Sequence, residues 1–250
     1  MPIFNDRTME TSKIRGTNYG FSARRVSDLG ACEYTLVGVA ADVSGSVAPF
    51  LREIEACVAQ VVEACRKSPR ADNLMLRLVA FASTLDEVHG FKPLTECNPA
   101  DYSGALARAG VGGTTALYDA THNGVEALRS YAETLNRSDF DVNGIVFVIT
   151  DGCDNHSTLT AAEVKKAMAD AVRGEDLESV VSVLVGVNIQ DRTVSKALLD
   201  FSARAGFTQY VEIANADAGT LARLARFVSR SVSSQSQSLG SGQASPALTF

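Results

Sequence analysis

Two short segments of this 250-residue chain place carboxylates and hydroxyls directly after apolar runs. Asp42-Val43-Ser44-Gly45-Ser46 follows the run Tyr34 to Ala41, and Asp151 follows the run Ile145 to Ile149 with only Thr150 between. Between the two lies a glycine-rich turn with paired hydroxyls, Val111 to Thr115. Two carboxylates and three neutral hydroxyls, with no imidazole or thiolate, suit a hard divalent cation such as octahedral Mg²⁺. The residue types predict a cation site if these segments meet.

The hydrophobic pattern predicts the elements that would bring the segments together. Apolar runs indicate buried strands at 34–41, 74–81, 144–150, 179–187 and 209–213, with 85–91 returning as an antiparallel edge strand. Apolar positions three and four residues apart indicate helices after Ser46 and at 116–135, 161–172, 193–205 and 218–232. Ser46 is expected to cap the first of these helices. Alternating strands and helices predict a doubly wound α/β fold, with a mainly parallel sheet, one antiparallel edge strand and helices on both faces.

The predicted fold also gives a reason for the three segments to meet. In open parallel sheets, ligands bind outside the carboxyl ends of the strands, and both Asp42 and Asp151 stand at such ends. We expect one domain over residues 34–232, preceded by an extension, 1–33, in which residues 19–26 could pair at a sheet edge. Residues 233–250 are rich in serine, glutamine and glycine, and are expected to prolong the last helix or to be disordered.

These motifs resemble the metal-ion-dependent adhesion site of the von Willebrand factor A domain family. The matching residues are Asp42-x-Ser44-x-Ser46, the Gly-Gly-Thr turn that runs into Ala116-Leu-Tyr-Asp-Ala120, and Thr150-Asp151-Gly152. The resemblance covers about residues 34 to 232. It implies that both serines bind the cation directly, while the two aspartates act through water.

The resemblance also implies one threonine ligand and an acidic partner. Thr115 is favoured because it immediately precedes Ala116-Leu-Tyr-Asp-Ala120, and Thr114 remains the alternative. The expected cation is Mg²⁺, with Mn²⁺ or Ca²⁺ possible, and an Asp or Glu of another protein would fill its open position. The chain is similar to short intracellular bacterial members, including tellurite-resistance-associated ones, some of which accompany kinases, phosphatases or AAA+ ATPases.

Composition excludes several other classes of function. The net charge of −6 and the absence of a dense Lys/Arg block argue against nucleic-acid binding. The first 15 residues lack an apolar signal segment, and no later run approaches the roughly 20 residues of a membrane helix. We therefore expect a cytoplasmic protein that binds neither nucleic acid nor membrane.

The competing interpretation is a Mg²⁺-dependent phosphohydrolase with Asp42 as nucleophile. Phosphoaspartate hydrolases of the haloacid dehalogenase type carry a second aspartate two residues later as general acid, and Ser44 stands in that place. The chain also lacks a Gly-x-Ser-x-Gly elbow and a P-loop. We therefore assign no catalytic residue and expect a binding module.

Several further residues near the motifs or of reactive type have simpler explanations. Asp119 is expected to interact with the dipole of its helix, Asp154 and Asn155 to be turn residues, and His156 to be a solvated rim residue. The five cysteines form no C-x-x-C pair. We therefore expect reduced thiols that are buried in the case of the first four, Cys32, Cys57, Cys65 and Cys97, and packed in a turn in the case of Cys153.

Overall fold

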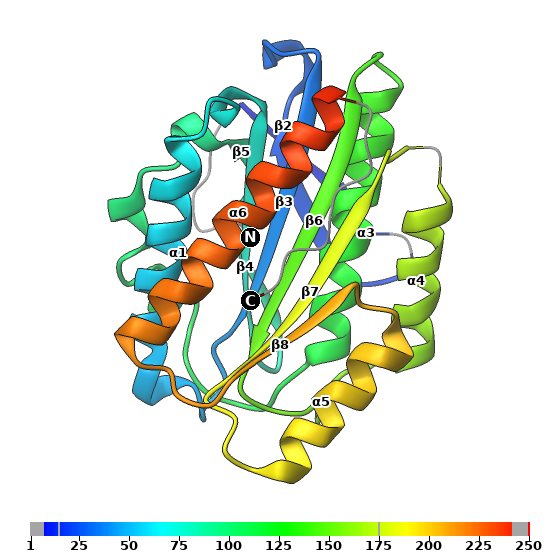
Figure 1. The fold of residues 1–250 in the computed structure, drawn as a ribbon. Coiled ribbons are helices and arrows are strands. Elements are labelled where there is room, and N and C mark those ends of the chain that lie inside the picture. The colour runs from blue at the N-terminus through cyan, green and yellow to red at the C-terminus, as the bar shows by residue number, and fades with distance from the viewer. Residues whose placement is uncertain (1–7, 15, 175, 242–249) are drawn as a thin grey trace.

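A single sheet with helices on both faces forms the body of the protein (Figure 1). The structure is a computed structural model and describes residues 8–14, 16–174, 176–241 and 250. The strands are β1 (Met9–Lys13), β2 (Gly20–Arg24), β3 (Glu33–Asp42), β4 (Leu74–Phe81), β5 (Leu85–Pro93), β6 (Asp141–Thr150), β7 (Val180–Val187) and β8 (Gln209–Ile213). The helices are α1 (Leu51–Arg66), α2 (Ala105–Arg108), α3 (Leu117–Asn136), α4 (Ala161–Arg173), α5 (Arg192–Ala205) and α6 (Ala218–Ser241).

The strand order in the sheet is β1-β2-β5-β4-β3-β6-β7-β8. The central strand β3 is parallel to both of its neighbours, β4 and β6, and the parallel run continues through β7 and β8. The predicted mainly parallel α/β fold is therefore confirmed. β5 is antiparallel to β4, as predicted, but it lies inside the sheet because β2 pairs with its other side. β1 then pairs antiparallel with β2 and forms the edge, so residues 9–13 and 20–24 of the expected extension belong to the sheet.

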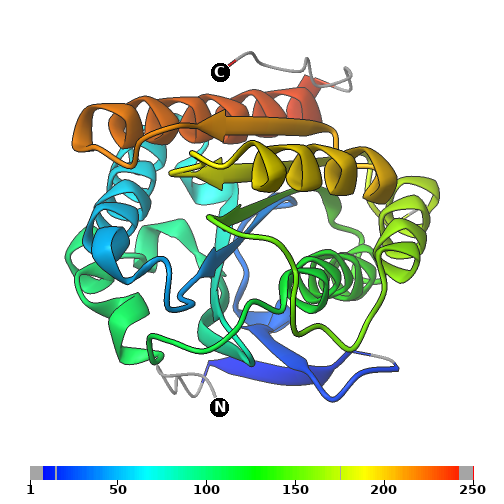
Figure 2. The ribbon, with the colours of Figure 1, turned by 90° about the horizontal axis from the view of Figure 1, so that it is seen from below.

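Successive residues of β3 enter two different apolar cores. Val37, Val39 and Ala41 pack with residues of α1 and α6, whereas Leu36 and Ala40 pack with residues of α3, α4 and α5. Figure 2 shows α1 on one side of the sheet and α3 and α4 on the other. A strand that is covered on both faces needs apolar residues at every position, which explains its continuous hydrophobic run. Packing from both sides fixes the carboxyl end of β3, where Asp42 lies.

The start of α1 differs from the sequence prediction. A short 3₁₀ turn, Ala48–Phe50, precedes the helix, and Phe50 occupies the N-cap position without a side-chain cap. The expected capping role of Ser46 is therefore wrong. The Ser46 hydroxyl instead donates a hydrogen bond of 2.8 Å to Asp151 Oδ1, because a carboxylate acceptor lies within reach across the loop.

The structure also tests the predictions for the cysteines and for the last part of the chain. Cys57, Cys65 and Cys97 are buried as predicted, whereas Cys32 is exposed because it lies in the loop that leads into β3. α6 continues to Ser241 and so includes the first part of the predicted tail, while residues 242–249 lie outside the described residues. Within the part of the chain that the structure describes, no helix has both the length and the apolar composition that crossing a membrane requires.

Candidate metal site

The three predicted loops meet at one edge of the sheet. β3 ends at Asp42 and β6 ends at Thr150, and these two strands are parallel neighbours, so both loops leave from the same side. The glycine-rich turn joins them through its backbone, because the Gly112 amide donates a hydrogen bond of 2.9 Å to the Val43 carbonyl. The structure thus brings together loops that lie more than 100 residues apart in the chain, as the 105-residue separation of the Ser46–Asp151 contact shows.

The glycine-rich turn adopts a conformation that other residues rarely take. Gly112 and Gly113 have φ values of 127° and 81°, both in the region that favours glycine. A Cβ atom on Gly113 would lie 2.5 Å from Ser83 Oγ. Ser83, which follows β4, also accepts a hydrogen bond from the Thr114 amide at 3.1 Å, and its hydroxyl lies 3.0 Å from Thr114 Oγ1. Ser83 therefore fixes the turn from the side of β4.

Four oxygen-bearing side chains form the centre of the site. Ser44 Oγ lies 3.3 Å from Ser46 Oγ, and Ser46 Oγ lies 2.8 Å from Asp151 Oδ1. Asp42 is fully buried below them, with Oδ1 accepting a hydrogen bond of 2.8 Å from the Ser44 amide. Its Oδ2 accepts a hydrogen bond of 2.7 Å from the Thr150 hydroxyl. The carboxylate of Asp42 thus orients the loop that carries both serines.

Both carboxylates are held in a poorly hydrated environment. Burial raises the pKa of Asp42 to about 6, although the hydrogen bonds from Ser44 and Thr150 partly oppose the shift. The nearby negative charge of Asp151 raises it further, and burial also raises the pKa of Asp151 itself. Among the ion pairs of the described residues, no Lys, Arg or His pairs with either aspartate. The described part of the chain therefore places no cationic side chain in an ion pair with either carboxylate.

The spacing of the oxygens fits a divalent cation. Neighbouring ligands of an octahedral ion with bonds of about 2.1 Å lie about 3.0 Å apart. The Ser44–Ser46 and Ser46–Asp151 oxygen distances, 3.3 and 2.8 Å, fall on either side of that value. No group of three or more His, Cys, Asp or Glu side chains within the described residues could hold a metal ion. A cation at this edge would therefore need the serine hydroxyls as ligands.

The two threonines of the turn have different environments. Thr114 is exposed, and its hydroxyl lies beside Ser83, whereas Thr115 is only 4% exposed. The Thr115 amide donates a hydrogen bond of 2.7 Å to Asn155 Oδ1, and the Thr115 carbonyl accepts one of 3.0 Å from the Asn155 amide. Asn155 is thus a turn residue, as predicted, that also ties the threonine turn to the loop after β6.

Asp119 lies in the first turn of α3, where an acidic side chain interacts favourably with the helix dipole as predicted, and it also makes contacts that were not predicted. The Asp119 side chain is buried, and its carboxylate accepts hydrogen bonds from the amides of Thr158 and Leu159 at 2.9 to 3.2 Å. Ser157 Oγ accepts a hydrogen bond of 3.0 Å from the Tyr118 amide, at the start of the same helix. Asp119 therefore anchors the loop that follows Asp151 and takes no part in the oxygen cluster.

The sequence did not predict two residues that support the site, Ser83, which holds the glycine turn, and Ser157, whose hydroxyl oxygen accepts a hydrogen bond from the Tyr118 amide at the start of α3. It pointed to Thr150 and Asn155 but not to their contacts with Asp42 and Thr115. Each of the four residues acts across loops that are distant in sequence. His156 is exposed, as predicted, and Cys153 is half-buried.

Comparison with known proteins identifies the fold. No protein-family model matches the sequence, and no curated protein sequence matches it. The structure is similar to a von Willebrand factor type A protein from Catenulispora acidiphila, with a TM-score of 0.56 and 14% identity over 86% of this chain and 44% of that one. It is also similar to proximal thread matrix protein 1 from the mussel byssus, with a zinc-occupied metal-ion-dependent adhesion site, at a TM-score of 0.54 and 18% identity over 80% of this chain and 46% of that one.

A third similar structure is the pilus adhesin SpaC from Lactobacillus rhamnosus GG, with a TM-score of 0.59 and 12% identity over 82% of this chain and 31% of that one. The chain thus spans less than half the length of each of these three proteins. Sequence identities this low support a similarity of fold and not a similarity of activity. The conclusion they support, together with the strand order and the covered parallel sheet, is that this chain has a von Willebrand factor A-like α/β fold.

Proposed function

We propose that the chain is a divalent-cation-dependent protein-binding module. The cation site consists of Asp42, Ser44, Ser46, Thr115 and Asp151. The observation that carries the proposal is the chain of contacts from Ser44 Oγ through Ser46 Oγ to Asp151 Oδ1 above a buried Asp42. The motif of a metal-ion-dependent adhesion site in one structural relative is consistent with it.

Some residues of the site would bind the cation, and others would orient the loops that carry those ligands. The exposed Ser46 and the buried Ser44 contribute neighbouring hydroxyl oxygens, and the buried Asp42 carboxylate fixes their loop through the Ser44 amide. Thr115 is the better candidate of the two threonines, because Thr114 is engaged with Ser83 and faces solvent. Asp151 belongs to the site through its contact with Ser46.

A bound divalent cation would supply an electrophilic position for one oxygen ligand from outside the chain. An Asp or Glu side chain of a partner protein fits that position, since a carboxylate adds negative charge where the bound ion leaves positive charge exposed. We assign Mg²⁺ as the ion because hydroxyl and carboxylate oxygens suit it, with Mn²⁺ or Ca²⁺ as alternatives. A cytoplasmic location and an intracellular assembly as partner belong to this proposal.

Catalysis by Asp42 is less well supported. A phosphoaspartate mechanism needs a carboxylate that can reach a substrate, whereas Asp42 is fully buried with one hydrogen bond to each oxygen. Ser44 stands where such a mechanism needs a general acid. We therefore propose a binding role without catalysis, and Mg²⁺-dependent turnover of phosphoesters that Asp42→Asn abolishes would contradict it.

Titration calorimetry with Mg²⁺ and Mn²⁺ tests the site directly. We expect saturable binding in the wild type and loss of binding in the Ser44→Ala, Ser46→Ala double variant. The paired variants Thr115→Ala and Thr114→Ala share chemistry and differ by one position, and only the first should weaken binding. Unchanged affinity in the serine double variant would refute the site, and a larger effect from Thr114→Ala would assign the ligand to that residue.

Affinity capture tests the binding role. Partners recovered by the wild-type chain should be lost on chelation, should return when Mg²⁺ is restored, and should be absent with Ser44→Ala. The Thr114→Ala variant serves as the matched control that keeps its partners. Partners that are indifferent to both chelation and Ser44→Ala would show that the cation plays no part in recognition.

A further inference from the structure

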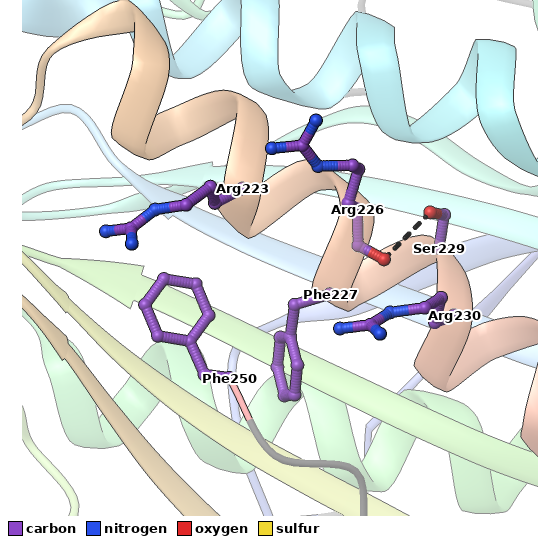
Figure 3. Close-up of a pocket in the computed structure, with 6 residues that line it drawn as sticks. All are labelled: Arg223, Arg226, Phe227, Ser229, Arg230 and Phe250. Carbon is purple, nitrogen blue, oxygen red and sulfur yellow. Dashed lines mark hydrogen bonds between the residues drawn. The ribbon is translucent and has the colours of Figure 1, made fainter.

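A pocket of about 470 Å³ lies on α6 and involves none of the candidate metal ligands (Figure 3). Its lining residues are Arg223, Arg226, Phe227, Ser229, Arg230 and Phe250. The arginines are exposed and Phe227 is buried, with 1% exposure. Figure 3 shows the Arg223 and Arg230 side chains on either side of the two phenylalanine rings. We call this feature the arginine pocket.

The arginine pocket carries three positive side chains. Arg223, Arg226 and Arg230 are three and four residues apart, so they share one side of the helix over a rise of about 10 Å. None of them forms an ion pair within the described residues. The carboxylate of Asp217, at the start of α6, already accepts hydrogen bonds from the amide and hydroxyl of Thr220. Three like charges along two turns of a helix favour an anionic ligand.

The arginine pocket also has a space that fits an aromatic ring. The ring of Phe250 stands edge-on to Phe227, with centroids 5.7 Å apart and an interplanar angle of 89°. The guanidinium carbon of Arg223 lies 5.7 Å from the centroid of the same ring. Phe250 is nevertheless 38% exposed, and an exposed cation–π contact contributes only about 0.5–1 kcal/mol. A ring from another molecule could therefore replace Phe250.

We propose that the arginine pocket is a second binding site, which takes an acidic peptide segment of a partner protein that carries an aromatic side chain. The aromatic side chain occupies the position of Phe250 between Arg223 and Phe227. Flanking carboxylates of the segment pair with Arg226 and Arg230. Phe250 competes for the pocket from within the chain.

The observations favour a peptide over a membrane or a nucleic acid. Membrane binding needs a cluster of exposed apolar side chains, yet of the large exposed apolar residues that the structure describes, Val111, Val172, Leu199 and Phe250, only Phe250 lines this pocket. Nucleic-acid binding needs a broader basic surface than three arginines on a chain of net charge −6. A space that holds one ring beside a short cationic stripe matches an aromatic residue among acids.

The probe is a blocked pentapeptide with two glutamates on each side of a phenylalanine, labelled at one end and titrated by fluorescence anisotropy. We use the full chain with chelator present, so that the candidate metal site cannot contribute and the two proposals fail independently. Arg230→Gln should weaken binding about tenfold, the loss of one charge-assisted hydrogen bond. Arg173→Gln, which changes an exposed arginine of α4, is the matched control and should change nothing. Phe250→Ala should strengthen binding, because it removes the internal competitor.

Two control probes test the chemistry of recognition. Glutamine in place of glutamate should abolish binding, and leucine in place of phenylalanine should weaken it. Absence of saturable binding even to the Phe250→Ala variant would overturn the proposal, as would equal losses from Arg230→Gln and Arg173→Gln. Binding to anionic phospholipid vesicles or to a single-stranded oligonucleotide without binding to the peptide would assign the pocket to that ligand and also overturn it.

Discussion

The Thr150→Val substitution tests the buried contact that joins the two acidic loops. The single hydroxyl proton of Thr150 has two acceptors within reach, Asp42 Oδ2 at 2.7 Å and the Gly152 carbonyl at 3.1 Å. The shorter contact to a charged acceptor is the stronger one. Thr150 Oγ1 in turn accepts a hydrogen bond of 3.2 Å from the Gly152 amide. Valine keeps the shape of threonine and removes both hydrogen bonds.

The cost of this substitution depends on the charge of Asp42. A hydrogen bond to a charged group contributes about 1.5–3 kcal/mol, so we expect the free energy of unfolding to fall by about 2 kcal/mol when Asp42 is ionised. Burial has raised the pKa of Asp42 from 3.8 to about 6, so the folded chain binds more protons at Asp42 than the unfolded chain between these pH values. Asp42 therefore contributes stability that is fully present below pH 3.8 and is lost as pH rises through 6. The substitution raises this pKa further, because it removes a stabilising donor. The destabilisation should therefore be full at pH 8 and below about 1 kcal/mol at pH 5.

Urea denaturation at both pH values, with chelator present, measures this difference. Thr121→Val is the matched control, because Thr121 is also buried but its hydroxyl donates to the neutral Leu117 carbonyl at 2.8 Å within α3. Its effect on the free energy of unfolding should not depend on pH. An equal loss for Thr150→Val at pH 5 and pH 8 would refute the assignment of this hydrogen bond to an ionised Asp42.

Three further predictions concern the supports of the fold. Glu55→Gln should lower the free energy of unfolding by about 2–4 kcal/mol, because the buried Glu55 carboxylate accepts hydrogen bonds from three backbone amides at 2.8 to 3.1 Å. Urea titrations measure this change, and a loss below about 1 kcal/mol would contradict the prediction. Burial lowers the pKa of His89 to about 3, so the unfolded chain binds one more proton at this residue below pH 6.5. His89 should therefore contribute a loss of stability of up to about 2 kcal/mol between pH 6.5 and 5, which urea titrations measure as the difference between the wild type and His89→Gln, because Asp42 contributes with the opposite sign in both chains. Gly113→Ala should lower the thermal midpoint in calorimetry, with strain of about 1–3 kcal/mol from its φ of 81° and its contact with Ser83, whereas Gly152→Ala, with nothing within 4 Å, should not.

The sequence predicted the sheet well because its central strands are covered on both faces. The continuous apolar run before Asp42 is typical of a buried strand, and the run before Thr150 has the same character. The edge was harder to predict, because β1 and β2 are short, and the side chains of β1 are largely exposed, so their periodicity gives little signal. Ala23 of β2 pairs with Phe91 of β5, and the residue type of Ala23 alone did not predict this pairing.

The site likewise contains residues that a local motif reveals and residues whose contacts depend on distant parts of the chain. The types of Asp42, Ser44 and Ser46 and their spacing lie within five residues, so the sequence reveals them directly. The contacts of Ser83 and Asn155 depend on how the loops approach one another, and serine and asparagine are common in any loop. Even the incorrect capping role of Ser46 has this origin, because its actual acceptor, Asp151, lies 105 residues away.

The two proposed sites share a physical feature, because each gathers side chains of one charge. The buried Arg77, whose side chain is 2% exposed and lies 2.7 Å from Glu87, shows the alternative, a charge that is paired within the chain. Among the described residues, two carboxylates with raised pKa values at the carboxyl edge of the sheet have no cationic partner in an ion pair, and three arginines on α6 have no acidic one. The buried, unpaired Asp42 carboxylate costs stability in the free chain, and a bound cation would offset part of that cost. At the exposed arginines, an acidic ligand would instead add a favourable attraction between opposite charges. A cation bound at one site and an acidic segment bound at the other would each complete an electrostatic arrangement that the fold leaves open.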